Sequence, residues 1–141
     1  MPSGPLANLK VVDLSTVLAG PNCARYLADF GAHVIKVENP KTGDSLRGMA
    51  WKDPRDGKGL WWKLVNRNKQ TIAADLKNPD DLQFIKDLID EADVLAENFR
   101  PGVLERLGLH PDDLLKRNKK LVIVRVTGFG QTGPYAQRSE E

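Results

Sequence analysis

The chain has 141 residues, of which 40% are hydrophobic and 28% charged, and its formal net charge is +2. This length suffices for one domain with its own core, and the composition excludes a disordered chain. The near-balanced charge gives no support for nucleic-acid binding, and no apolar run reaches the roughly 20 residues of a membrane-spanning helix. Because no signal peptide is evident and Cys23 is the single cysteine, we expect a cytoplasmic protein without an internal disulfide.

The first third of the chain predicts a β-α-β unit. Lys10–Leu14 and Val34–Val37 are short apolar segments typical of buried strands. Between them, Pro21 suits the start of a helix and Gly31 suits its end. The turn Ser15–Gly20 then lies where the first strand meets the helix.

The rest of the chain continues this alternation after a long loop from Asn39 to about Gly59. Asn78-Pro79-Asp80-Asp81 is a strong helix start, with an N-cap, a proline at the first position and acids in the first turn. We expect this helix to continue to Ala92. The other predicted elements are a short helix at Leu60–Leu64, strands at Thr71–Asp75, Val94–Asn98 and Leu121–Thr127, and helices at Pro101–Leu107 and from Pro111 onward.

Alternation of apolar strands with helices predicts the α/β class, a Rossmann-like parallel sheet with helices on both faces. In such sheets the ligand binds beyond the carboxyl ends of the strands, where the strand order reverses. The informative residues should therefore lie in the loops that follow strands. These are Ser15–Pro21, Glu38–Arg47, Lys77, Asn98–Gly102 and Gly128–Pro134.

Several common chemistries find no support. His33 and His110 are far apart in unlike contexts, so we expect no metal site. No Gly-x-Ser-x-Gly elbow is present. Cys23 is interpreted as a small buried apolar residue. Gly128–Gly133 matches the dinucleotide-binding pattern G-x-G-x-x-G, but it follows the fifth strand and opens no predicted helix, so we expect another ligand or a plain connection.

Basic and aromatic residues leave two interpretations open. Five basic residues fall in or near loops that follow strands, namely Arg47, Lys69, Lys77, Arg100 and Arg106. Each alone is by default a solvated surface residue, but together on one edge they could hold phosphates. Trp51, Trp61 and Trp62 are expected in the core or in an interface.

Long strings of the chain resemble the class III CoA-transferases, the carnitine and bile-acid type. The similarity runs from about Pro5 to Arg138, with motifs in the same order and spacing. The motifs are Val12–Pro21, Leu27–Glu38, Thr42–Asp44, Asn68-Lys69, Asp75–Lys77, Ala92–Val94, Glu97–Gly102, Glu105–Gly108 and Thr127–Tyr135.

The resemblance implies transfer of CoA from an acyl-CoA to a carboxylic acid acceptor. In the family, an aspartate attacks the thioester and an aspartyl-CoA intermediate follows, which is covalent catalysis by a carboxylate. CoA is then a substrate rather than a tightly bound cofactor, and the full-length protein is an interlinked homodimer.

The resemblance also implies which residues contact CoA. Thr16, Val17, Leu18 and Ala19 match positions of the first loop, and Lys77, Asn98, Phe99 and Arg106 match further contact positions. An arginine suits a phosphate, and an asparagine offers both a donor and an acceptor to an amide such as that of pantetheine. Asn39 departs from the family, in which some members place an arginine after the acid.

A larger departure concerns the nucleophile, which in the family lies downstream of the Gly128–Pro134 loop, whereas this sequence ends at Glu141. Asp13 and Asp75 match structural positions instead. Residues 1–141 thus resemble the N-terminal part of the CoA-binding large domain, without the smaller domain or the returning C-terminal segment. We expect an incomplete fold that is inactive alone. One alternative is the front half of an α-methylacyl-CoA racemase, but the loop Gly48–Trp62 favours the transferase. The other alternative is a non-catalytic CoA-binding module.

Overall fold

The computed structural model describes residues 3–138, which contain one sheet of five parallel strands. The strands are β1 (Lys10–Asp13), β2 (His33–Glu38), β3 (Lys69–Ala73), β4 (Val94–Glu97) and β5 (Val122–Arg125). Their order in the sheet is β3-β2-β1-β4-β5. The order therefore reverses between β1 and β4, and the predicted α/β class is confirmed.

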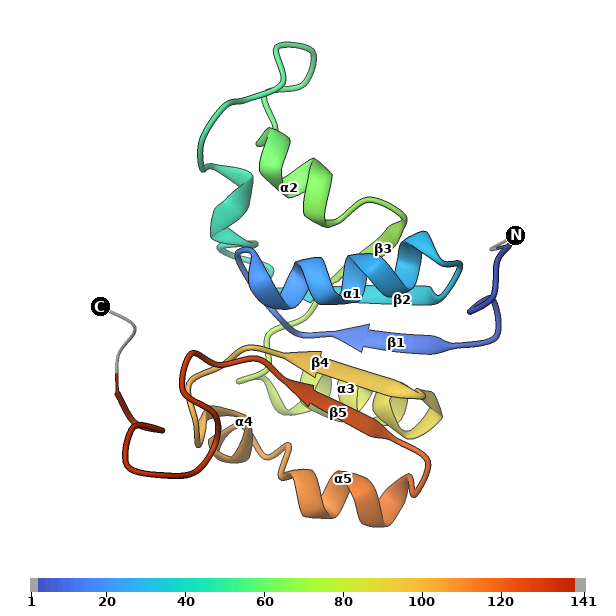
Figure 1. Ribbon diagram of the computed structural model, residues 1–141, viewed down its shortest axis with the longest axis vertical. Helices are drawn as coiled ribbons and strands as arrows, with labels where there is room; N and C mark the ends of the chain where they lie inside the picture. The colour runs from blue at the N-terminus through green and yellow to red at the C-terminus, as the bar shows by residue number, and fades with distance from the viewer. Residues whose placement is uncertain (1–2, 139–141) are drawn as a thin grey trace.

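Helices cover the two faces of the sheet (Figure 1). On one face lies α1 (Ala19–Asp29), which contributes Ala24 and Ala28 to a small cluster of buried residues. On the other face lie α3 (Pro79–Glu91), α4 (Val103–Arg106) and α5 (Pro111–Arg117). These three helices pack around a larger apolar cluster that includes Ile85, Ile89 and Leu104.

Between β2 and β3 the chain leaves the sheet and forms a projection that we call the lobe, residues 39–66 (Figure 1). It contains a 3-10 turn, η1 (Ser45–Arg47), and the short helix α2 (Leu60–Val65). An isolated antiparallel bridge between Lys52 and Gly59 closes its outer loop. The lobe lies at the carboxyl end of β2, the end where a ligand is expected.

The helix start predicted from the sequence is present at the N-terminus of α3. Asn78 is the N-cap, and its side chain accepts from the backbone N–H groups of Asp80 and Asp81 at 2.9 and 3.2 Å. Pro79 follows at the first helical position. Gly31, after α1, has a φ of +100°, a conformation that side chains rarely adopt.

Three expectations were wrong. β3 begins at Lys69, two residues before the predicted start at Thr71, because Lys69 is already paired with Val34 of β2. Trp51 is 71% exposed, so its expected place in the core is wrong, whereas its alternative place in an interface stays a prediction. Cys23 is only half-buried, because it lies beside the inward-facing side of α1.

Two other findings concern the described residues. Within residues 3–138 no helix is long and apolar enough to cross a membrane. The segment Gly128–Gly133 runs through bends, and up to residue 138 no helix follows it. A dinucleotide-binding glycine motif opens a helix, so this segment matches the motif in sequence but not in structure.

Candidate functional site

Two loops meet where the strand order reverses. Residues 14–18, here called the switch-point loop, connect β1 to α1, and Asn98 directly follows β4. The Asn98 side chain accepts from the backbone N–H of Thr16 at 2.8 Å and donates to the Thr16 carbonyl at 2.8 Å. One amide side chain thus holds the two peptide units on either side of Thr16.

Close packing at this point requires Gly20, in the first turn of α1. A Cβ atom at this residue would lie 2.3 Å from the Ser15 Cβ and 3.2 Å from the Asn98 Cβ. The missing side chain lets the start of α1 approach both loops. In dinucleotide-binding folds a glycine has the same role, bringing the helix start close to the strands where phosphate groups bind.

The N-terminus of α1 carries no acid of its own. Its first turn has no acidic residue, and the side chain of its N-cap residue, Leu18, makes no capping hydrogen bond. Unpaired N–H groups and the positive end of the helix dipole favour an anion there. This helix end lies beside the switch-point loop, within the region that the sequence predicted as the ligand site.

Val17, in the switch-point loop, has a strained backbone, with a φ of 66°. For a β-branched residue this left-handed conformation is an outlier that costs about 1–3 kcal/mol, and it persists only where the surrounding contacts hold it. The Val17 N–H donates to both carboxylate oxygens of Asp44, at 3.2 and 3.3 Å. Asp44 comes from the lobe, so the lobe stabilises the strained loop.

Beneath the loop lie two ion pairs whose four side chains have no exposed surface. Lys36 is 3.1 Å from Asp44, and Lys69 is 2.9 Å from Asp13. Lys36 also donates to the Ser15 carbonyl at 2.8 Å. Burial disfavours the charged ammonium and holds the pKa of Lys69 below its usual value. Such pairs contribute little net stability, because desolvation offsets their attraction, but they fix geometry.

A second polar cluster fastens the lobe to the end of β2. Glu38 accepts from Arg47 Nε at 2.6 Å, from Trp62 Nε1 at 3.1 Å and from the Asp44 N–H at 3.1 Å. The Arg47 guanidinium also stacks 3.7 Å from the centroid of the Trp62 ring. Burial raises the pKa of Glu38, but hydrogen bonds from Arg47 and Trp62 outweigh it and leave the pKa below its usual value.

The position of Glu38 matters because an acid at the end of the second strand binds the ribose in NAD-dependent enzymes. Here both oxygens of the Glu38 carboxylate already accept from protein donors. The Glu38 carboxylate is therefore engaged by residues of the lobe.

Three of the predicted CoA-contacting residues, each from a different loop, line one pocket of about 240 Å³. They are Thr16, Lys77 and Phe99. Its apolar wall is formed by Leu14, Val37, Ala74, Leu76, Phe99 and Leu107, and Glu38 and Asp44 lie at its lobe side. The pocket thus lies at the carboxyl ends of the strands, as predicted.

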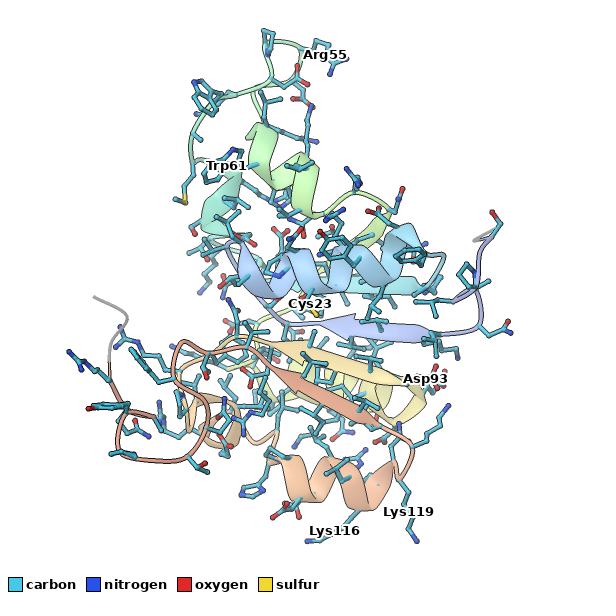
Figure 2. All side chains as sticks on the ribbon, in the orientation of Figure 1. Cys23, Arg55, Trp61, Asp93, Lys116 and Lys119 are labelled. Carbon is cyan, nitrogen blue, oxygen red and sulfur yellow. The ribbon has the colours of Figure 1, made fainter. Side chains whose placement is uncertain are left out.

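The other predicted residues lie around this pocket. Leu18 and Ala19 line an open hollow of about 370 Å³ with Trp61 and Leu64 of α2, and Figure 2 shows Trp61 on the lobe above the helix that carries Cys23. Asn98 lines a hollow of about 290 Å³ on the β5 side.

Val17 and Arg106 line none of these three spaces. Val17 is half-buried between Asp44 and the loop. Arg106 is exposed in the last turn of α4, next to the pocket residue Leu107. The eight contacts to CoA stay predictions, of which the structure gathers three in one pocket.

The five basic residues that could together hold phosphates do not form one group. The side chain of Lys69 is buried under the switch-point loop, and Arg47 is paired with Glu38, so the interpretation as a phosphate-holding group is wrong for these two. Both are retained by carboxylates of the protein itself. Lys77, Arg100 and Arg106 are exposed at the carboxyl edge, where they remain available to a ligand.

The buried ion pairs were missed by sequence reasoning, although a signal existed. Lys36 stands inside the apolar strand Val34–Val37, and Asp13 ends the apolar run of β1. A charged residue within a strand covered on both faces needs a buried partner of opposite charge.

Among residues 3–138 no group of three or more His, Cys, Asp or Glu residues could hold a metal ion.

Known proteins similar to this chain share one family. The model of CoA-transferase family III matches residues 6–140. The β subunit of succinyl-CoA–L-malate CoA-transferase from Chloroflexus aurantiacus is 48% identical over 134 residues, which are 95% of this chain and 33% of that protein. Succinyl-CoA–D-citramalate CoA-transferase from the same organism is 46% identical, over 98% of this chain and 34% of that protein.

A solved structure is similar as well. The crystal structure of a CAIB/BAIF family protein from Brucella suis superposes with a TM-score of 0.89 at 40% identity, over 96% of this chain and 36% of that one. The chain thus spans about a third of the length of the relatives it matches. Since the family model covers nearly every residue, the chain belongs to CoA-transferase family III.

Proposed function

We propose that this chain binds the CoA moiety of an acyl-CoA at the switch point and serves its transfer to a carboxylic acid. The observation that carries the proposal is the convergence of Thr16, Lys77 and Phe99, from three separate loops, on one pocket. The N-terminus of α1, whose first turn carries no acid, follows Thr16 along the switch-point loop and borders the hollow lined by Leu18 and Ala19. This combination suits an adenine on the apolar wall and phosphates near the helix end and Lys77.

The pocket is smaller than the whole ligand. Its volume of about 240 Å³ lies below the range of about 300–1,000 Å³ that is typical for drug-sized ligands. We therefore assign it to the adenine end of CoA. The pantetheine arm would leave along the switch-point loop, towards the hollow lined by Leu18 and Ala19. Asn98 acts there indirectly, since its amide already holds Thr16.

The carboxylates at the pocket do not suit the covalent step. Glu38 and Asp44 accept protein hydrogen bonds at both oxygens. Asp75 accepts from the Lys77 N–H at 3.0 Å and matches a structural position of the family. We propose that these 141 residues bind CoA but do not complete the transfer alone, because the nucleophile of the family lies downstream of Gly128–Pro134.

The relatives suggest what the acceptor is. Two of them are named for succinyl-CoA as donor and for L-malate and D-citramalate as acceptors. Both acceptors are hydroxylated dicarboxylic acids. We propose an acceptor of this class for the whole protein, which would act in the cytoplasm as a homodimer.

Calorimetric titration of the chain with CoA tests the binding proposal. Lys77→Ala should weaken binding about tenfold, the effect of one lost charge-assisted hydrogen bond of ~1.4 kcal/mol. The matched control is Lys116→Ala on α5, since Figure 2 shows this lysine at the far end of the molecule from the lobe. An absence of binding, or equal loss in both variants, would contradict the proposal.

A transfer assay tests the second part. The chain is incubated with succinyl-CoA and L-malate, and the formation of malyl-CoA is followed. We expect no product above the level found without protein, and turnover would show that these residues contain a nucleophile.

A further inference from the structure

We propose that Asp44 is a positioning residue that holds the switch-point loop in its ligand-binding shape by stabilising Val17 in the left-handed conformation. The inference rests on the proposed binding of CoA. Asp44 borders the pocket, but its side chain has no exposed surface. Its carboxylate accepts from the Val17 and Leu46 N–H groups and forms an ion pair with Lys36. Its effect on a ligand is therefore transmitted through the loop.

The backbone strain at Val17 is the reason why a hydrogen bond to Asp44 can determine the conformation of the loop. A valine with a φ of 66° returns to negative φ when nothing holds it. That change would rotate the peptide units on both sides of Val17 and so redirect Thr16 and Leu18. Asp44 opposes it by accepting the Val17 N–H, and the Asn98 amide donates to the Thr16 carbonyl at the other side of the same peptide unit, so the two side chains together hold the unit that precedes the Val17 Cα.

Lys36 makes the arrangement a rigid unit. Its ammonium group lies 3.1 Å from an Asp44 oxygen and donates to the Ser15 carbonyl at 2.8 Å. One buried cation thus connects β2, the lobe and the switch-point loop. Because Asp44 belongs to the lobe, docking of the lobe and the shape of the ligand loop are coupled. A loosened lobe would weaken binding through the loop, in addition to any loss at the lobe residues that line the pocket.

The test replaces both charges at once with Lys36→Met/Asp44→Leu, which leaves no unpaired buried charge and should fold. Without ligand, hydrogen exchange at the amides of residues 15–19 should become faster than in the wild type, with exchange in α3 unchanged. In titrations CoA should bind about tenfold more weakly, since the loop must be re-formed on binding.

Rescue distinguishes positioning from a general structural role. Glycine adopts positive φ at no steric cost. Val17→Gly added to the double variant should therefore restore part of the CoA affinity, whereas Val17→Ala should restore less. If the double variant fails to fold, Val17→Gly in the wild-type background decides, because relief of strain should raise its midpoint of thermal unfolding above that of Val17→Ala.

Unchanged exchange at residues 15–19, or an affinity that glycine does not restore, would overturn the positioning role. If the wild type does not bind CoA at all, the proposed function fails, and the exchange experiment without ligand still decides the role of Asp44. The two failures are thus separable.

Discussion

Two buried regions of the molecule are built in opposite ways. Under α3 the interior is apolar, with Ile85, Ile89 and Leu104 fully buried. Under the switch-point loop the interior is ionic, with the pairs Lys36–Asp44 and Lys69–Asp13. Apolar burial stabilises without demanding one geometry, whereas a buried ion pair contributes little net energy but tolerates few geometries. The chain thus uses its core for stability and its charges to define the site.

The largest expected effect comes from breaking one ion pair on one side only. Lys69→Met leaves the Asp13 carboxylate buried without its cation, which should cost about 3–5 kcal/mol of unfolding free energy. Urea unfolding at pH 7 measures the loss. The control is Lys120→Met, whose exposed pair with Asp93 should contribute at most ~1 kcal/mol. Equal losses of unfolding free energy in both variants would show that burial of the ion pair does not increase the cost of breaking it.

A cavity in the apolar region should cost slightly less and leave the site intact. Ile89→Ala removes a fully buried side chain and should reduce the unfolding free energy by about 3 kcal/mol. Below the unfolding transition, CoA affinity measured by calorimetry should equal that of the wild type. A parallel fall in affinity would mean that the two regions are not independent.

Overpacking at the junction should have an intermediate effect on stability and also reduce binding. Gly20→Ala places a Cβ 2.3 Å from the Ser15 Cβ, so α1 must shift, at a cost of about 1–3 kcal/mol. Gly48→Ala is the matched control, because the nearest atom to its Cβ would be the Ser45 carbonyl oxygen at 3.8 Å. Both variants are compared by thermal unfolding and by CoA titration. Equal unfolding midpoints and equal CoA affinities in the two variants would contradict the prediction.

The smallest expected effect is the pH dependence of the Glu38 cluster. Burial raises the pKa of Glu38, but the hydrogen bonds from Arg47 and Trp62 lower it by more than burial raises it. The pKa of Glu38 in the folded state therefore lies below its value in the unfolded state. The stabilisation is complete above the unfolded pKa and disappears as the pH falls through the folded value. The advantage of the wild type over Glu38→Gln should therefore shrink below about pH 4. An advantage that stays constant down to pH 3 would contradict this linkage.

The sequence predicted the sheet well because its signals are local. Five apolar segments, separated by helix starts such as Asn78-Pro79 and ends such as Gly31, were enough to place the strands. The error at the start of β3 arose because Lys69 was taken for a loop residue, whereas its position is decided by pairing with Val34, far away in the sequence.

The site was predicted only as far as its residues come from loops after strands. Thr16, Lys77 and Phe99 do meet, as the parallel sheet requires. The support beneath them was not predictable in the same way, because Asp44 reaches Val17 through the fold of the lobe, 27 residues later in the chain. Side-chain pairing over such distances leaves only a faint trace in a single sequence, here a lysine within an apolar strand.

The three tryptophans of the chain, Trp51, Trp61 and Trp62, all lie in the lobe. Their emission therefore reports on that segment alone, while far-ultraviolet circular dichroism reports on the helices and strands of the whole molecule. A lobe that detaches before the sheet melts would give two transitions at different denaturant concentrations. The native chain thus contains its own fluorescent reporter for the lobe, the segment that carries Asp44.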